Sequence, residues 1–215
     1  MKQKQAGFTL IEIAIVLVII GLILGGVLKG QEMITNGKLK SVTKDLDGIT
    51  TAVNVYVDRY RRTPGDDGPL ATLQARGGAW TAITNAGNNN GVLAITAAQT
   101  FTAGGEGVAF WQHLKSSGLI TGNVTDVGVA ALPRHAFGGL IGVTGVGVTG
   151  MTGNVVCLSQ MPGQGAQAID TQIDDGVPSS GAVRATQGAV GANTAPGAAE
   201  VAYSEDNVYT VCRNF

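Results

Sequence analysis

The stretch that decides the fold is residues 8–28, FTLIEIAIVLVIIGLILGGVL. Its 21 residues carry a single charge, that of Glu12. At about 1.5 Å per residue, a helix of this length spans the hydrocarbon core of a bilayer. Lys2 and Lys4 precede the segment, so the positive-inside rule keeps the start of the chain in the cytoplasm and sends the rest outward. Residues 8–28 are therefore predicted to form a transmembrane helix.

A secretory signal peptide is the ordinary alternative for an apolar N-terminus. Such a peptide has a shorter apolar region that is closed by a small-residue cleavage site of the A-x-A type. No site of this type closes residues 8–28, so a membrane helix is the favoured interpretation.

The residues around the start of the apolar segment, AGFTLIE at positions 6–12, resemble the recognition site of prepilin peptidase in the type IV pilin superfamily. The resemblance lies in a short basic leader, Gly7 before the cut, Phe8 after it, and Glu12 further on. It implies that residues 1–7 are a leader, that the peptidase cleaves between Gly7 and Phe8, and that Phe8 becomes N-methylated. It also implies a homo-oligomeric filament, built by an inner-membrane assembly machinery.

Glu12 needs an explanation of its own, because an isolated carboxylate in a membrane helix is costly and usually paired or functional. The apolar segment contains no Lys, Arg or His. Cleavage before Phe8 would create an amine, and the amine of a neighbouring subunit could pair with Glu12, which is the subunit-assembly role that the resemblance assigns to this residue. The alternative is a carboxylate that snorkels to the cytoplasmic interface, about one turn away.

Residues 29–62 continue the helical pattern, and two features define this half. Apolar side chains recur there at alternating spacings of three and four, as in an amphipathic helix that lies on a globular body. The sequence TPGDDGP at positions 63–69 then ends the helix, since Pro and Gly do not sustain it. The apolar stripe consists of Leu39, Val42, Leu46, Ile49, Val53, Tyr56 and Tyr60.

The helix departs from many type IV pilins at Lys29, where those proteins carry a proline about three turns into the mature chain. Four glycines lie nearby instead. Each costs about 1 kcal/mol relative to Ala in a helix, so together they could weaken it there. They could equally be small-residue packing sites between helices. The glycines are Gly21, Gly25, Gly26 and Gly30.

Residues 63–215 are predicted to form an extracytoplasmic globular head. The predicted fold class is α+β, a pilin fold in which the long N-terminal helix packs on a small antiparallel β-sheet. Gly-rich residues 63–104 are expected to be a loop with little regular structure. The other expected head elements are a helix near 106–117, strands at 140–144 and 154–157, and a helical turn at 166–173.

Two cysteines, Cys157 and Cys212, lie in the predicted head. In an exported chain they indicate a disulfide, because oxidising compartments let such bonds persist; two unpaired buried thiols are the alternative. A disulfide between them would close a loop of about 55 residues, which would stabilise the fold by about 4 kcal/mol in the chain-entropy model. The pair also resembles the C-terminal disulfide loop of pilins, so we expect it to close a C-terminal loop.

The head offers little for catalysis or cofactor binding. His113 and His135 are isolated in the sequence, and we find no activated Ser or Cys motif. Residues 145–150 match G-x-G-x-x-G formally, but no helix pattern follows them. Asp174 and Asp175 are a weak Ca²⁺ candidate by similarity to a loop of the major type II secretion pseudopilin, yet the spacing of a calcium loop is absent, which favours a solvated turn. We therefore expect no enzyme, no cofactor and no metal site.

Charge is distributed unevenly along the chain. Residues 1–62 carry nine Lys or Arg against five Asp or Glu, whereas residues 63–215 carry five against ten. The basic residues do not cluster in the folded part, so no nucleic-acid partner is predicted.

The sequence thus predicts a structural subunit of a type IV pilus-like filament. Before assembly it would span the bacterial inner membrane once, in contact with lipid and with its N-terminus in the cytoplasm; afterwards it would belong to an extracellular or periplasmic filament. A type II secretion pseudopilin is the alternative, although the short leader and the cysteine pair resemble pilus subunits. A membrane-tethered periplasmic binding protein or enzyme with the same processed N-terminus is a third hypothesis.

Overall fold

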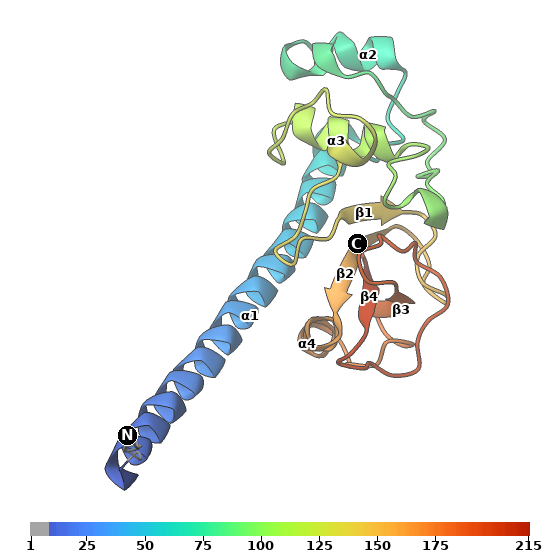
Figure 1. Ribbon diagram of the computed structural model, residues 1–215. Helices are drawn as coiled ribbons and strands as arrows, with labels where there is room; N and C mark the ends of the chain where they lie inside the picture. The colour runs from blue at the N-terminus through green and yellow to red at the C-terminus, as the bar shows by residue number, and fades with distance from the viewer. Residues whose placement is uncertain (1–8) are drawn as a thin grey trace, which may run out of the picture. The chain divides into compact units, whose positions relative to one another are not determined.

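The computed structural model describes residues 9–215, so residues 1–7 and Phe8 lie outside the described residues (Figure 1). The described chain has a mixed α+β architecture of the pilin kind, in which a long N-terminal helix precedes a small antiparallel sheet. This confirms the predicted fold class. The chain divides between Lys38 and Leu39 into two compact units. Its helices are α1 (Leu10–Tyr60), α2 (Leu70–Gln74), α3 (Gly107–Ser116) and α4 (Gly163–Ile173).

The first half of α1 is an apolar helix without a protein core around it. All the described side chains of residues 10–28 are exposed. This part of α1 is long and apolar enough to cross a membrane. The helix continues through Gly21 and Gly30, and a Cβ at either position would meet nothing within 4 Å. Water disfavours such a surface, so lipid or other chains must cover it.

The second half of α1, from Leu39 to Tyr60, belongs to the larger unit and supplies part of its hydrophobic core. The predicted apolar stripe is the face that is buried: its five central residues are at most 5% exposed, and Leu39 and Tyr60 pack against them. The helix ends where the sequence predicts, because Arg61 adopts a left-handed conformation (φ 56°) just before the TPGDDGP turn.

The sheet has strand order β1-β2-β4-β3, and all its pairs are antiparallel. Helix α4 packs against β2, β3 and β4, while α3 packs against β1 and is buried along its whole length. One continuous core therefore joins the sheet, α3, α4 and the second half of α1. The strands are β1 (Ile141–Thr144), β2 (Val155–Pro162), β3 (Val183–Gly188) and β4 (Val208–Asn214).

The expectation that residues 63–104 form a loop with little regular structure is only partly right. This segment contains α2 and two short 3₁₀ turns, at Gly78–Ala82 and Ala97–Gln99. The buried carboxylate of Asp66 also holds its Asn-rich part, since it accepts hydrogen bonds from the backbone N–H groups of Asn90 (3.0 Å) and Gly91 (2.8 Å). Hydrogen bonds to a buried charge thus fix a segment that lacks hydrophobic periodicity.

Candidate functional site

The described part of the N-terminal site begins at Thr9 and Glu12, which cap the start of α1. The backbone N–H and the hydroxyl of Thr9 both donate to the Glu12 carboxylate, each at 2.7 Å. In return, the Glu12 backbone N–H donates to the Thr9 hydroxyl at 3.3 Å. This reciprocal arrangement is a capping box, in which residues three apart satisfy free donors of the first helical turn. Glu12 therefore has a role within its own chain.

The charge of Glu12 is not neutralised by a cation within residues 9–215. Within these residues, its carboxylate accepts hydrogen bonds from Thr9 and forms no salt bridge. The nearest cation along the helix, Lys29, is engaged with Glu32 at 2.8 Å. Gly7 and Phe8, the predicted cleavage and methylation residues, lie outside the described residues.

Comparison with known protein families gives a match at the N-terminus of the chain. Residues 2–28 match the family model of the prokaryotic N-terminal methylation motif, which is the type IV prepilin signature. No curated protein and no solved structure matches the chain. The motif supports a precursor of the type IV pilin-like or pseudopilin kind and implies processing by prepilin peptidase and assembly into a filament. Prepilin-type subunits are structural, and the apolar half of α1 suggests membrane anchoring before assembly.

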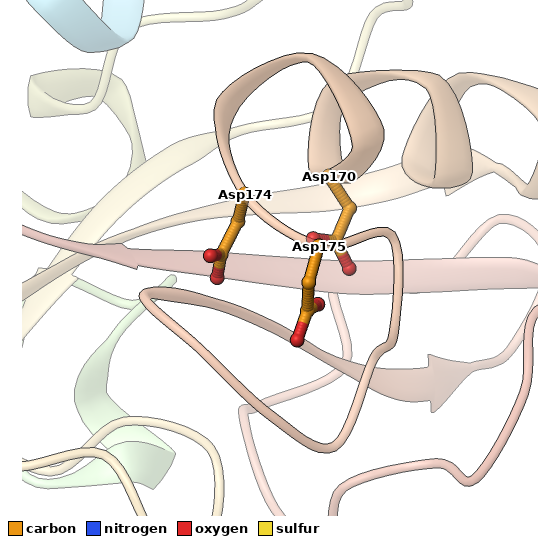
Figure 2. Close-up of side chains that lie close together, drawn as sticks. All are labelled: Asp170, Asp174 and Asp175. Atoms are coloured by element: carbon orange, nitrogen blue, oxygen red, sulfur yellow. The ribbon is translucent and has the colours of Figure 1, made fainter.

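The weak calcium candidate, Asp174 and Asp175, gains a third carboxylate in the structure. Figure 2 shows Asp170 of α4 beside them, and one oxygen of each residue lies within 4.8 Å of the others. Donors from the protein already approach all three carboxylates. Asp170 accepts from the Tyr203 hydroxyl (2.7 Å), Asp175 from the Ser180 hydroxyl (2.6 Å), and Asp174 from backbone N–H groups at the start of β3. Burial raises the pKa of Asp170, although the Tyr203 hydrogen bond opposes this. The cluster thus organises the turn between α4 and β3.

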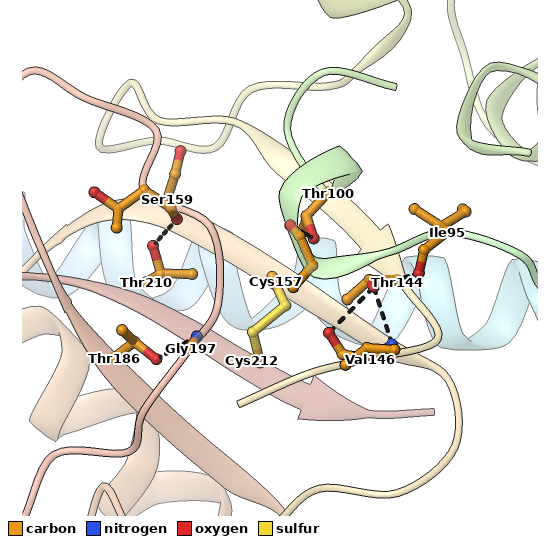
Figure 3. Close-up of a disulfide and its surroundings, with 12 residues drawn as sticks. Ile95, Thr100, Thr144, Val146, Cys157, Ser159, Thr186, Gly197, Thr210 and Cys212 are labelled. Atoms are coloured by element: carbon orange, nitrogen blue, oxygen red, sulfur yellow. Dashed lines mark hydrogen bonds between the residues drawn. A yellow bond between two sulfur atoms is a disulfide. The ribbon is translucent and has the colours of Figure 1, made fainter. Parts of the chain in front are cut away.

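A disulfide joins Cys157 to Cys212, as expected, and closes the C-terminal segment between them. The two residues are register partners on the central strands β2 and β4, and Figure 3 shows the bond crossing from one strand to the other. Both cysteines are fully buried. The bond therefore links the two central strands of the sheet covalently. The segment between the two cysteines contains α4 and β3.

A polar cluster that the sequence did not predict lies at the C-terminal end of α1, where Tyr56 and Asp67 are buried and Arg76 reaches the surface. The Asp67 carboxylate accepts from the Tyr56 hydroxyl at 2.8 Å and pairs with Arg76 at 2.9 Å. Burial and the nearby Asp67 charge raise the pKa of Tyr56, which therefore stays protonated. The Arg76 guanidinium also lies 4.4 Å from the Tyr60 ring centroid and 4.6 Å from that of Trp80. The cluster ties the TPGDDGP turn and α2 to the end of α1.

Both histidines are buried in the larger unit, where they form hydrogen bonds with the backbone. His113 stacks on Tyr56, and its Nδ1 accepts from the Gly65 N–H at 3.0 Å. The Nε2 of His135 lies 2.8 Å from the backbone carbonyl of Ser159, to which it donates in the corresponding tautomer. Within residues 9–215, neither ring forms a hydrogen bond with a Ser or Cys side chain. The histidines thus pack and position backbone.

We expect His113 to make folding sensitive to mild acid. Burial lowers its pKa to about 4, whereas an unfolded chain protonates at about 6.5. Because the unfolded state alone binds this proton between those values, stability should fall by about 3 kcal/mol as the pH drops from 6.5 to 4. Denaturant unfolding of the full chain in detergent, at a series of pH values, measures this loss.

The matched control is His113→Asn, whose side-chain oxygen can still accept from the Gly65 N–H. Other groups that titrate in this range are common to both proteins, so the difference between the two curves isolates His113. The variant should lose less stability than wild type between pH 6.5 and 4. If the stability of the two proteins falls equally with pH, His113 is protonated equally in the folded and the unfolded state.

Proposed function

We propose that this chain is a structural subunit of a type IV pilus-like filament. In this proposal, prepilin peptidase cleaves between Gly7 and Phe8 and methylates Phe8, and the subunits then polymerise through α1. The observation that carries the proposal is the methylation motif at residues 2–28, which runs directly into a helix whose apolar half is uncovered. An exposed apolar helix is stable first in a membrane and then among other such helices.

Glu12 is the residue that we propose to guide assembly. Its carboxylate has no cation within residues 9–215, although Thr9 orients it. The amine created at Phe8 of a neighbouring subunit would supply the missing positive charge. Ion pairing strengthens in a low-dielectric setting, so a subunit whose amine reaches Glu12 would be selected over one in a shifted position.

A secretion pseudopilus uses the same processing and is the second candidate. We place the chain with pilus subunits because its leader is short and its C-terminal part carries a cysteine pair, now seen as the β2–β4 disulfide. The proposed location is the inner membrane before assembly, with the N-terminus cytoplasmic, and a filament outside that membrane afterwards.

The direct test is the mass of the mature N-terminus. Mass spectrometry of assembled or membrane-extracted protein should find Phe8 as the first residue, with a single methyl group on its amine. In a Gly7→Val variant, which replaces the residue before the cut, the leader should remain attached. Mature protein that begins at Met1, or beyond residue 25, would contradict the proposed processing.

A further inference from the structure

The larger unit, from Leu39 onward, carries an exposed group of arginines and an exposed group of carboxylates in different places, besides the exposed Lys40 and Lys44 on α1. All five Lys and Arg side chains of residues 63–215 contact a carboxylate or a backbone carbonyl of the same molecule. Their contacts are Arg76 with Asp67 (2.9 Å), Lys115 with the Ala131 carbonyl (3.0 Å), Arg134 with the Gly138 carbonyl (2.9 Å), Arg184 with the Thr149 carbonyl (2.9 Å) and Arg213 with Asp47 (2.6 Å).

The C-terminal end of α1 carries an exposed cationic group, formed by Arg59, Arg61 and Arg62. Among residues 9–215, Arg59 and Arg62 have no ion pair. Arg61 approaches Asp58 at 3.3 Å, but both side chains are about 80% exposed, so this pair contributes little. Arg59 lies in the last turn of α1, where a cation is favourable for the helix dipole, whereas Arg61 and Arg62 lie beyond the helix.

An anionic group lies in the turn before β4, at Glu205 and Asp206. Both residues are exposed. Glu205 accepts a hydrogen bond from the Gln164 amide at 3.1 Å, and neither residue has an ion pair within the described chain. This turn thus presents exposed negative charge that no cation among residues 9–215 neutralises.

The two groups lie at opposite ends of the larger unit. The end of α1 lies beside α3, whereas the anionic turn lies beside the start of α4, where the Gly163 N–H donates to the Asn207 carbonyl at 2.9 Å (Figure 1). α3 and α4 are at opposite ends of this unit (Figure 1). The arginines and the acidic turn therefore cannot neutralise each other within one copy.

We propose that copies of this chain contact one another head to tail, with the cationic group of one copy on the anionic turn of the next. Two complementary surfaces at opposite ends of one molecule make a heterologous contact, which repeats along an open helical assembly. Opposite charges at such a contact fix its register and disfavour like-to-like docking. This inference rests on the proposed filament function and adds the contact between neighbouring heads.

Charge reversal and charge exchange in the full chain test the contact. Arg59→Glu with Arg62→Glu, and separately Glu205→Arg with Asp206→Arg, should each reduce surface filaments about tenfold or more, because like charges then face each other. All four substitutions together should restore filaments to within about twofold of wild type, since opposite charges meet again. A folding defect would not be repaired by adding further substitutions.

Cross-linking reports the contact even where filaments are few. Copies carrying Arg62→Cys and copies carrying Glu205→Cys, each with a different tag, are co-expressed, and dimers joined by a new disulfide are expected. Cells that express only one of the two cysteine variants should give few disulfide-linked dimers. The native cysteines are buried in their own bond and do not compete.

Two results would overturn the head-to-tail contact: the absence of mixed dimers, or reversal variants that assemble like wild type. Reversals that change surface attachment but not filament number would assign the arginines to another partner and would equally exclude the proposal. Failure of the filament function is seen separately, as an N-terminus that is not Phe8.

Discussion

Replacing Glu12 with Gln is expected to give a processed, membrane-resident subunit that forms few surface filaments. Gly7 and Phe8 remain, so cleavage should proceed. Removing a charge from an apolar helix should leave insertion unchanged or easier. The docking step should fail, because the amine of an incoming subunit would lack its counter-charge where unpaired charges are costly. Filaments sheared from cells that lack a wild-type copy, compared with processed subunit in the membrane, give the ratio that measures this effect.

Because of the capping box, Glu12→Gln is the variant that separates the charge of Glu12 from its hydrogen bonds. A Gln side chain can still accept from the Thr9 N–H and hydroxyl, so the start of α1 is retained while the charge is lost. Glu12→Ala removes both the cap and the charge, and Thr9→Ala removes the hydroxyl while the carboxylate remains. If only the two Glu12 variants lose filaments, the charge is responsible. Normal assembly of Glu12→Gln would instead support the snorkelling carboxylate.

The parts of the fold that could be read from the sequence are those set by local patterns. The apolar run at residues 10–28 and the spacing from Leu39 to Tyr60 specify α1 through its own period, and both halves are helical. Thr9 was readable too, because T-x-x-E before an apolar run is a capping-box pattern. The two roles predicted for Glu12, a partner for the amine of a neighbouring subunit or a snorkelling carboxylate, left this local cap out.

The polar cluster could not be predicted from local patterns, because its members are far apart in the sequence. Gly65 donates to His113, 48 residues further on, and Arg76 reaches back to Tyr56 and Asp67. No periodicity links such positions. Their pairing depends on how α2, α3 and the end of α1 pack together. The same reason explains why the order β1-β2-β4-β3 was not predicted, although residues 208–212 have the Val, Tyr and Thr typical of a strand.

Removing the disulfide is expected to destabilise the larger unit by about 4 kcal/mol, since it closes a loop of 55 residues. In Cys157→Ala with Cys212→Ala, two central strands lose their covalent link and the core loses two buried sulfur atoms. Denaturant unfolding of the full chain in detergent, followed by tryptophan fluorescence, measures the loss. Wild-type protein refolded with a reducing agent keeps both thiols in place and isolates the link from the lost volume. If that reduced protein unfolds within about 1 kcal/mol of the oxidised form, the ladder of β2 and β4 holds the sheet without the bond.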